Sequence, residues 1–289
     1  MDKPDISIII VNWKVKDLLQ KCINSILKYK GNYRIEIFVV DNNSEDGSVE
    51  MIRDNYPEVI LKALDENIGF GAANNIAIKE ARADYIFLLN PDTEITSDFL
   101  DNIFTYSRNN PGISIIGPRI INDDGSGQDS IRRFPDLISQ VLILLKLRNL
   151  LKNNSFINNY LCKDFDYSKE QFVDQIMGAA MFIHKSVIDK IGVFDEKFFI
   201  WFEEVDLCKR AQNFGIKIKY FPGAIISHHG GESFSKANIL KKQKMFNKSL
   251  LVYFSKHKPF WQTFIIFLLI PINLLLTLSY VIFLKAKTK

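Results

Sequence analysis

The chain has 289 residues, of which 47% are hydrophobic and 24% charged, and its formal net charge is +4. This size allows one large domain with a substantial core, alone or with appendages, and so mild a charge does not suggest a nucleic-acid-binding protein. The three cysteines (Cys22, Cys162 and Cys208) include no Cys-x-x-Cys pair, which argues against a disulfide framework or a zinc site and favours reduced thiols in the cytosol. No basic leader precedes the first apolar run, so we expect no signal peptide.

Strand-like and helix-like patterns alternate through the first 120 residues. Residues 6–11 are an apolar run rich in β-branched side chains, as expected of a strand buried on both faces. Further strands are predicted at residues 35–40, 59–64, 85–89 and 113–121, and helices at residues 17–29, 48–55 and 72–81. This order predicts an α/β fold with a doubly wound, mostly parallel sheet.

Polar residues follow the first four predicted strands at the point where each strand ends. Asn12 follows the first strand, Asp41 the second, residues 65–67 the third and residues 90–92 the fourth. Ligands of open α/β sheets bind beyond the carboxyl ends of the strands. The sequence therefore predicts a binding crevice at this edge of the sheet.

The acid after the second strand has two possible roles. The carboxylate of Asp41 can accept a hydrogen bond from a pyrimidine imide or a ribose hydroxyl, or it can cap the turn at Ser44 or Gly47. No Gly-x-Gly-x-x-Gly follows the first strand and there is no P-loop lysine, which argues against a dinucleotide-binding or P-loop enzyme.

The segment Asn90-Pro91-Asp92 places an acid just beyond the fourth strand. Such an acid can hold Mg²⁺ or Mn²⁺, which would bridge the oxygens of a diphosphate and stabilise a departing nucleoside diphosphate. The alternative is an Asx-type turn with a helix cap at Thr96 or Ser97.

Residues 134–161 are very apolar but contain Lys146, Arg148 and Lys152. Two interpretations stay open: a helix of the core, or an amphipathic surface helix near the membrane or the acceptor.

Three carboxylates, Glu203, Glu204 and Asp206, follow a run of aromatic residues. At least one of them can lie in a water-poor pocket where its pKa suits proton transfer, whereas a plain surface helix would instead pair Asp206 with Arg210 at i, i+4. His228, later in the chain, can join a distant acid on a divalent metal.

The segment from residue 260 to residue 284 carries no charge. As a helix it would be roughly 37 Å long, more than the ~30 Å hydrocarbon core of a bilayer, so it predicts a membrane-inserted segment. Pro271 and Asn273 leave room for a kinked or re-entrant form, and a core or oligomer helix is the alternative. Seven lysines lie in residues 236–258 and three after the segment, which predicts a catalytic part on the cytoplasmic face of the bacterial inner membrane.

Five motifs in order resemble those of family 2 glycosyltransferases, with the closest likeness to their bacterial rhamnosyltransferase-like branch, over roughly residues 5–230. They read Ser-Ile-Ile-Ile-Val-Asn-Trp, Val-Val-Asp-Asn-Asn-Ser-x-Asp-Gly, Glu-Asn-x-Gly-Phe-Gly-x-Ala-x-Asn, Leu-Leu-Asn-Pro-Asp and Trp-Phe-Glu-Glu-x-Asp-Leu. The resemblance implies a GT-A fold and an inverting, single-displacement transfer of a sugar from a nucleotide donor.

The resemblance also implies roles for individual residues. Glu204 matches the catalytic base, Asp92 and His228 match the ligands of Mg²⁺ or Mn²⁺, and Asp41 would lie beside the base of the nucleotide. Residues expected near the nucleotide sugar are Asn12, Asp41, Asn43, Asn67, Gly69, Asn75 and Asn90, and acceptor-side candidates are Trp201, Phe202 and Glu203. Phe198 and Phe199 are further candidates for that side.

Two positions depart from the family pattern. Asn90 replaces the first acid of the usual Asp-x-Asp motif, which leaves one strong metal ligand, although Asn-Pro-Asp is frequent in this branch. Glu204 stands where aspartate is common, so the longer side chain would keep the chemistry and shift the acceptor.

The resulting hypothesis is a membrane-associated transferase that moves rhamnose from dTDP-rhamnose to a lipid-linked or polysaccharide acceptor; a UDP-sugar donor is the alternative. A nucleotidyltransferase is disfavoured because residues 12–14 carry no glycine-rich basic loop, and a silent scaffold is disfavoured because both acids are present. Predicted divisions are a transferase domain at residues 1–230, a basic helical linker at 231–258 and an apolar helix at 259–285. A homo-oligomer stays open.

Overall fold

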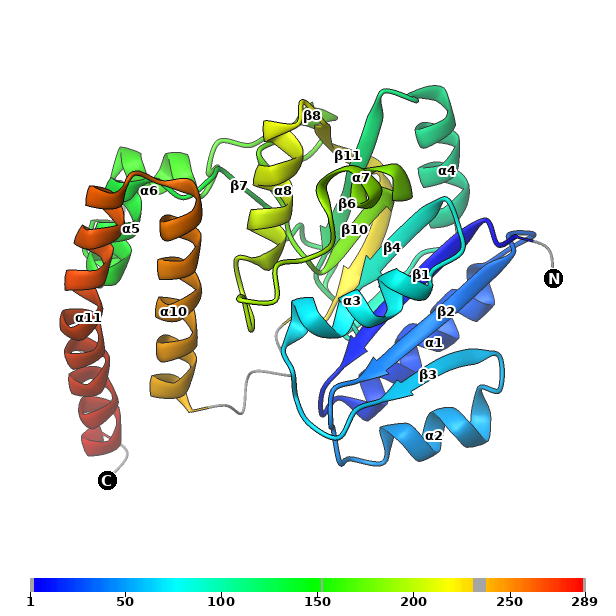
Figure 1. The fold of residues 1–289 in the computed structure, drawn as a ribbon, viewed down its shortest axis with the longest axis horizontal. Coiled ribbons are helices and arrows are strands. Elements are labelled where there is room, and N and C mark those ends of the chain that lie inside the picture. The colour runs from blue at the N-terminus through cyan, green and yellow to red at the C-terminus, as the bar shows by residue number, and fades with distance from the viewer. Residues whose placement is uncertain (1–2, 152, 231–237, 288–289) are drawn as a thin grey trace.

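The computed structural model describes residues 3–151, 153–230 and 238–287. Its centre is a nine-stranded sheet with the strand order β3-β2-β1-β4-β10-β6-β11-β5, and β8 pairs beside β11 (Figure 1). The strands are β1 (Ile6–Asn12), β2 (Ile35–Asp41), β3 (Val59–Ala63), β4 (Tyr85–Leu89), β5 (Thr93–Ile95), β6 (Ile113–Ile121), β8 (Gln171–Phe172), β10 (Ala180–His184) and β11 (Lys217–His228). Two short strands, β7 (Ile131–Arg132) and β9 (Gln175–Ile176), pair with each other.

Helices cover both faces of this sheet, and a further group of helices stands beside it (Figure 1). The helices of the sheet are α1 (Lys16–Tyr29), α2 (Ser48–Asn55), α3 (Phe70–Glu80), α4 (Phe99–Asn109), α7 (Lys185–Ile191) and α8 (Glu203–Asn213). The others are α5 (Leu137–Leu144), the 3₁₀ turn Leu147–Asn149, α6 (Ser155–Tyr160), α10 (Ile239–His257) and α11 (Phe260–Lys287).

The side chains of strand β1 are buried on both faces of the sheet. Ile8 and Ile10 pack with α1, α2 and α4, whereas Ile9 and Val11 point the other way and pack with α3, α7 and α8. All four side chains are buried. The apolar run of residues 6–11 is therefore required on both faces, as the sequence predicts.

The predicted α/β class is confirmed, and the first four strands lie parallel in the order β3-β2-β1-β4. Beyond β4 the sheet is mixed, because β10 runs antiparallel to both β4 and β6. The carboxyl ends of β1 and β2 meet in register, with Asn12 opposite Asp41.

A helical layer, made of α5, α6, α10 and α11, lies at one end of the sheet (Figure 1). Besides the two apolar clusters on the two faces of the sheet, a third apolar cluster joins this layer to the rest of the molecule. In this third cluster, Tyr253 and Phe254 of α10 pack with Phe198 and Phe202 of the loop before α8. Residues 134–161 are divided among α5, the 3₁₀ turn and α6, so neither predicted single helix describes them. The division of the chain at residues 230 and 258 stays a prediction.

The apolar segment forms one continuous helix, α11, with Pro271 inside it. Asn273 is buried in the helical layer: its Nδ2 donates to the carbonyl oxygen of Leu144 at 2.7 Å, and its Oδ1 accepts from Asn247 Nδ2 at 2.9 Å. These two bonds satisfy the amide group in an apolar surrounding, and they fix α11 against α5 and α10.

Gly69 allows the start of α3 to approach the loop before α8. Its φ is +91°, and a Cβ at this position would lie 2.5 Å from the carbonyl oxygen of Phe199. That oxygen accepts a hydrogen bond from the backbone N–H of Phe70 at 2.8 Å. The two segments are therefore held together where a side chain has no room.

We expect Gly69→Ala to lower the free energy of unfolding by about 3 kcal/mol, because it adds a backbone clash to the cost of a positive φ. Gly125→Ala is the matched control, since Gly125 has a φ of +80° and open space around it. We expect that control to lose about 1 kcal/mol. Urea unfolding in detergent, followed by tryptophan fluorescence, measures both. Equal losses for the two variants would show that the close contact with Phe199 is unimportant.

Candidate active site

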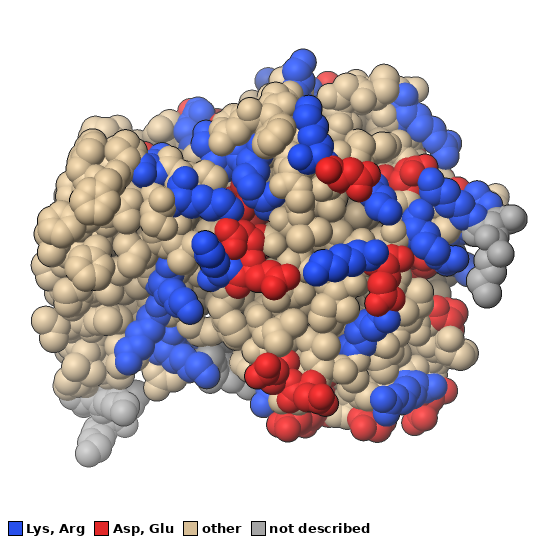
Figure 2. Space-filling model, viewed as in Figure 1, with Lys and Arg blue, Asp and Glu red and all other residues tan. Residues whose placement is uncertain are grey.

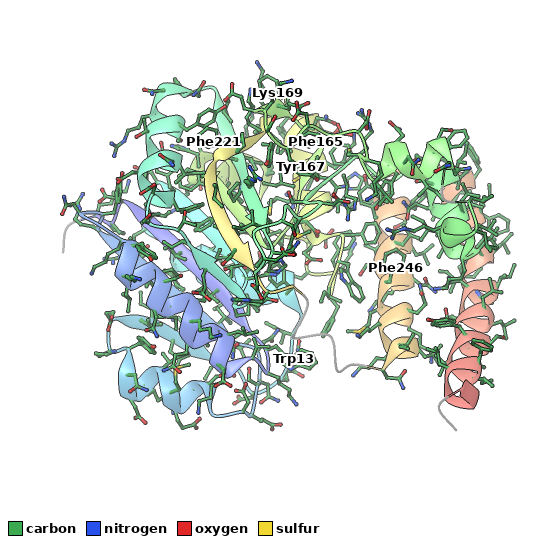
Figure 3. The ribbon with its side chains drawn as sticks, turned by 180° about the vertical axis from the view of Figure 1, so that it is seen from behind. Trp13, Phe165, Tyr167, Lys169, Phe221 and Phe246 are labelled. Carbon is green, nitrogen blue, oxygen red and sulfur yellow. The ribbon has the colours of Figure 1, made fainter. Side chains whose placement is uncertain are left out.

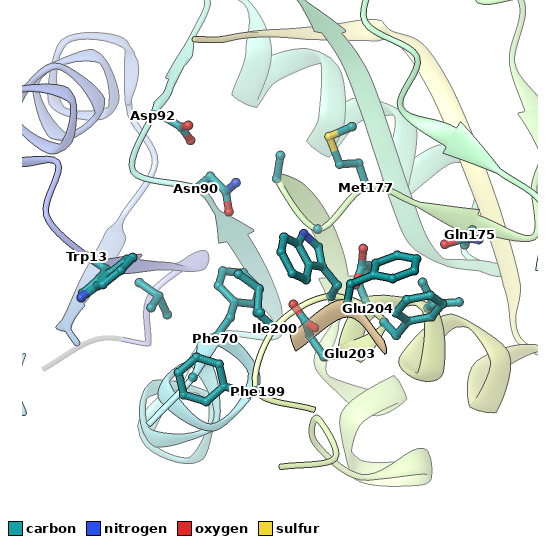
Figure 4. A pocket seen from close by; sticks show the side chains of 18 of the residues that line it. Trp13, Phe70, Asn90, Asp92, Gln175, Met177, Phe199, Ile200, Glu203 and Glu204 are labelled. Carbon is teal, nitrogen blue, oxygen red and sulfur yellow. The ribbon is translucent and has the colours of Figure 1, made fainter. Parts of the chain in front are cut away.

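A cavity of about 520 Å³ opens at the carboxyl ends of β1 and β4. One side carries Trp13, Asn90 and Asp92, and the other carries Glu203 and Glu204 (Figure 4). The predicted site residues that line it are Asn67, Gly69, Asn90, Asp92, Trp201, Phe202, Glu203, Glu204 and His228. Asn12, Asp41, Asn43 and Asn75 do not line it.

Asp41 and Asn12 support the floor of the cavity. The carboxylate of Asp41, which is almost fully buried, accepts hydrogen bonds from Asn12 Nδ2 at 2.8 Å and from the backbone N–H of Ser44 at 3.0 Å. The turn-capping role that the sequence left open is therefore present. A direct role of Asp41 at a nucleotide base stays a prediction.

Asn75 fastens the loop that leads to the carboxylates. Its Nδ2 donates to the carbonyl oxygen of Phe194 at 2.9 Å and to Glu196 Oε1 at 3.0 Å, and its Oδ1 accepts from the backbone N–H of Phe194 at 3.0 Å. Asn75, which was predicted to bind the donor, therefore lies outside the cavity lining and holds the loop before α8 in place. Phe198, a candidate for the acceptor side, is fully buried in the third cluster, whereas Phe199 lines the cavity.

Asp92 and His228 meet on one wall because β11 pairs with β5, which sets His228 opposite Thr93. His228 Nε2 lies 3.3 Å from Asp92 Oδ1, and both side chains are almost completely buried. The buried Nε2 makes no hydrogen bond. An imidazole nitrogen and a carboxylate oxygen at this separation suit two neighbouring ligands of one hard cation, because ligands at right angles and ~2.1 Å from a metal lie about 3 Å apart.

The tautomer of His228 also suits a metal ligand. Gln128 Nε2 donates to the carbonyl oxygen of His228 and to Asn122 Oδ1, each at 2.7 Å, so its Oε1 is left as the acceptor. That oxygen lies 2.9 Å from His228 Nδ1. We therefore assign the proton of the ring to Nδ1, which leaves the lone pair of Nε2 directed toward Asp92.

Two protein ligands alone do not make a closed metal site. Within residues 3–151, 153–230 and 238–287, no cluster of three or more His, Cys, Asp or Glu side chains is arranged to hold a metal. Mg²⁺ sites of enzymes commonly combine one or two protein ligands with the oxygens of a substrate phosphate and water. Asp92 and His228 therefore fit a cation that is held jointly with a bound diphosphate.

Glu203 and Glu204 begin α8 on the opposite wall, where Glu203 is buried and Glu204 is partly buried. Burial raises the pKa of both carboxyl groups, and the charge of Glu204 raises the pKa of Glu203 further, well above its usual range. Backbone N–H groups at the helix start and the charge of Arg132 act in the opposite direction on the pKa of Glu204. The surroundings thus separate the two acids: Glu203 holds its proton, and Glu204 ionises first.

Arg132, Tyr160 and Gln175 are among the lining residues that the sequence analysis did not name. Arg132 is the single lysine or arginine among the described residues of the cavity wall. It lies on β7 opposite Gln175, on the two-residue strand pair that closes the end of the cavity near Glu204. Strands this short give no periodic pattern, so nothing in the sequence marked Arg132.

The loop before Glu203 is strained and is held in place by α10. Trp201 and Phe202 both have positive φ values, +62° and +70°, which aromatic residues rarely adopt. Ser249 Oγ donates to the carbonyl oxygen of Ile200 at 2.7 Å, and the ring of Phe246 contacts the rings of both Trp201 and Phe202. The helical layer therefore helps to set the direction of the two carboxyl groups.

Asp206 joins the same helix to α10. The predicted pair with Arg210 is confirmed, with Nε 2.8 Å from Asp206 Oδ2. Two further side chains, which the sequence analysis missed, reach Asp206 Oδ1: Lys256 Nζ at 2.8 Å and His257 Nε2 at 2.7 Å. Burial opposes ionisation of Asp206, but hydrogen bonds from His257, Lys256 and Arg210 lower its pKa to about 2.

Residues 7–191 match the family model of Glycosyl transferase family 2. The chain is similar to an N-acetylglucosaminyl-diphospho-decaprenol L-rhamnosyltransferase of Mycobacterium tuberculosis, with 25% identity over 79% of this chain and 77% of that protein. It is also similar to the rhamnosyltransferase WbbL of Escherichia coli K12, with 27% identity over 80% and 87% of the two chains. The dTDP-rhamnosyl transferase RfbF of Shigella flexneri shows 23% identity over 73% and 66%.

A solved structure shares the fold. GalNAc-T7, crystallised with UDP, GalNAc and Mn²⁺, superposes with a TM-score of 0.60 at 14% identity, over 86% of this chain and 48% of that one. The predicted GT-A type of fold is confirmed by this likeness and by the family match.

We expect Asp206→Asn to destabilise the fold by about 2–4 kcal/mol at pH 7, because it leaves the charges of Arg210 and Lys256 beside a neutral, buried amide. The native pKa of about 2 is below the unfolded value of ~3.9, so the ionised carboxylate stabilises the fold above that value and the contribution is lost as the pH falls through about 2. The difference in unfolding free energy between variant and wild type, measured from pH 7 down to pH 2, should therefore stay constant to about pH 5 and shrink as the pH falls from about 4 toward 2.

Asp166→Asn is the matched control, because Asp166 pairs with Lys169 on the exposed surface. We expect no measurable loss of stability from it. If the two variants behave alike, the buried cluster around Asp206 does not stabilise the fold.

Proposed function

The chain belongs to glycosyl transferase family 2, and we propose that it is a metal-dependent, inverting enzyme that moves rhamnose from dTDP-rhamnose to a hydroxyl group of a lipid-linked acceptor. We place this reaction in the synthesis of a bacterial cell-surface glycan. The relatives named as rhamnosyltransferases support rhamnose as the sugar, and the name of RfbF, a dTDP-rhamnosyl transferase, supports dTDP as its carrier. A UDP-sugar donor is the alternative.

One observation carries the proposal: Asp92 and His228, which are suited to hold a cation, lie across one cavity from Glu204, a carboxyl group with a raised pKa. Asp92 and His228 lie on the wall at the carboxyl end of β4 and β11, and Glu204 lies on the opposite wall. Transfer from a nucleotide sugar needs both functions, because negative charge builds on the leaving diphosphate while the attacking hydroxyl loses a proton.

Glu204 is the proposed base. It takes the proton of the acceptor hydroxyl, the oxygen bonds to the anomeric carbon on the face opposite the diphosphate, and the bond from that carbon to the diphosphate breaks. Glu203, protonated because of its raised pKa, can donate a hydrogen bond to the acceptor without competing for the proton. When bound between Asp92 and His228, a divalent cation supplies charge compensation to the departing diphosphate.

The nucleotide would occupy the side of the cavity that Trp13, Asn42 and Asn67 line. Asp41 lies just beneath this side, and each of its oxygens accepts one hydrogen bond from the protein, which leaves acceptor capacity. We keep the pairing of Asp41 with a pyrimidine imide as part of the proposal.

The acceptor would enter from the end near Tyr160 and Arg132. The first relative is named for an acceptor that carries a diphosphate on a polyprenol. A guanidinium group at this end suits an acceptor with an anionic linkage, and α11 would keep the enzyme at the cytoplasmic face of the membrane where such a lipid is found. Over Phe260–Leu284, α11 is long and apolar enough to cross a membrane.

A panel of nucleotide sugars tests the proposal. Purified full-length protein in detergent is offered dTDP-rhamnose, UDP-glucose, UDP-N-acetylglucosamine and GDP-mannose with Mn²⁺ or Mg²⁺, and sugar release and transfer to polyprenyl-diphosphate N-acetylglucosamine are measured. We expect dTDP-rhamnose to be used best, with activity lost in EDTA and restored by excess metal. Selective use of GDP-mannose would contradict dTDP-rhamnose as the donor, and full activity in EDTA would contradict the proposed metal dependence.

We expect Glu204→Gln to lower kcat by about 10²–10⁴-fold with donor affinity unchanged, because the amide keeps the shape and cannot accept the proton. Glu203→Gln is the control: it resembles the protonated acid, so we expect a much smaller loss. Because the raised pKa of Glu204 must be exceeded for it to act as a base, the wild-type rate should rise with pH through that value and then level. A silent Glu204→Gln beside an inactive Glu203→Gln would reverse the two roles.

A further inference from the structure

The helix α11 has two unlike sides. Ile266, Asn273 and Thr277 are almost fully buried, lie at i, i+7 and i+11, and face the helical layer. The remaining surface is apolar and exposed. Its large exposed side chains are Phe260, Trp261, Phe264, Phe267, Leu268, Ile272, Leu275, Leu276, Leu278, Tyr280, Ile282 and Phe283. This apolar side is too extensive to be left in water.

The neighbouring helix α10 is basic along its exposed side. Lys241, Lys244 and Lys248 are exposed and lie at i, i+3 and i+7, which makes one stripe. Neither α10 nor α11 contains an aspartate or a glutamate. Figure 2 shows basic side chains between the uncharged edge of the helical layer and the sheet domain.

The two helices run antiparallel, and their register is fixed (Figure 1). Asn247 of α10 bonds to Asn273, which is near the middle of the apolar stretch Phe260–Leu284. Lys244 and Lys248 are within three residues of Asn247, so they lie within about 5 Å of the level of Asn273 along the helix axis.

This register decides between the two ways in which α11 can enter a membrane. If α11 crossed the bilayer, the charges of Lys244 and Lys248 would be carried to the middle of the hydrocarbon, where a charged side chain is strongly disfavoured. α10 cannot stay behind, because Leu250, Tyr253 and Phe254 are fully buried in the third cluster against the loop before α8.

We infer that α11 lies parallel to the membrane plane, with its exposed apolar side in the boundary between headgroups and acyl chains and the lysine stripe of α10 at the anionic headgroups. This arrangement satisfies the apolar side and the lysines at once. It extends the proposed membrane association and does not depend on the identity of the sugar donor.

The inference explains how a lipid-linked acceptor can reach the cavity. Phe246 of α10 and Tyr160 of α6 both line the cavity. The helical layer that would contact the membrane therefore also forms part of the cavity wall. Phe246 projects from α10 (Figure 3), and its ring contacts the rings of Trp201 and Phe202 in the loop before α8. The diphosphate and sugar of the acceptor can enter the cavity while the hydrocarbon chain stays in the bilayer.

Depth measurements on full-length protein in vesicles test the orientation. Phe264→Trp, Ile272→Trp and Phe283→Trp, each combined with Trp261→Phe, place a fluorophore at three levels of α11 within about 100° of arc, and the Trp261→Phe parent gives the background of Trp13 and Trp201. Quenching is measured with lipids brominated near the headgroup or near the chain end. We expect equal, shallow quenching at all three levels. Deep quenching of Ile272→Trp with shallow quenching at both ends would show that α11 crosses the bilayer.

The lysine stripe is tested separately by vesicle binding. Replacing Lys241, Lys244 and Lys248 with glutamine should weaken binding to vesicles of phosphatidylglycerol and phosphatidylcholine by about 100-fold, at about 1 kcal/mol for each charge near the surface. The control replaces the exposed Lys21, Lys30 and Lys79 with glutamine, which makes the same change in net charge on the sheet domain.

If both triple variants weaken vesicle binding equally, the proposed contact of the lysine stripe with anionic headgroups is wrong. If full-length protein forms a dimer without detergent and does not bind vesicles, a second copy of the chain covers the apolar side of α11. Sugar transfer to a short soluble acceptor, measured in parallel, distinguishes these failures from failure of the proposed function.

Discussion

Three side chains with nitrogen donors, Arg210, Lys256 and His257, converge on the buried carboxylate of Asp206, and this cluster joins the parts of the molecule that the site requires. Arg210 belongs to the same helix as Asp206, whereas Lys256 and His257 come from the end of α10. Arg210 also donates to the carbonyl oxygens of Ile191 and Val193 at 2.6 and 2.8 Å. The loop before α8, α8 itself and the helical layer are thus tied to one charge that no water reaches.

This tie matters because the loop it holds is strained. Two successive aromatic residues with positive φ values store unfavourable backbone energy, of the order of 1–3 kcal/mol each, that packing must offset. The contacts of Phe246 and Ser249 supply part of that packing. The result is that Glu203 and Glu204 start a helix at the cavity wall, where burial and mutual repulsion separate their pKa values.

The helical layer has a second consequence. Because Asn247 bonds to Asn273, α10 and α11 act as one unit, and a crossing helix would cost about 2.5–3.5 kcal/mol for each lysine carried to the bilayer centre. The same unit walls the cavity through Phe246. Membrane binding and substrate access therefore depend on the same helices.

Much of the fold could be predicted from the sequence because the strands of a doubly wound sheet are apolar on both faces and end in polar residues. The clustering of Asp92 with His228 followed from the family motifs, and the Asp206–Arg210 pair followed from helical spacing. Arg132 could not be predicted, since a two-residue strand has no period, and neither could the contacts of Lys256 and His257 with Asp206, since they join segments about 50 residues apart. Asn75 was expected near the donor because of its place in the family motif, but its amide bonds to the loop before α8.

Hydrogen exchange of full-length wild type and Asp206→Asn most directly tests whether one buried charge unites the loop, α8 and the helical layer. In detergent at pH 7, we expect the variant to exchange faster at the backbone amides of residues 199–205 and also at residues 250–254 of α10, while the amides of β1 and β4 keep their protection. Faster exchange confined to α8, with α10 unchanged, would show that the helical layer is held independently of Asp206 and would contradict this coupling.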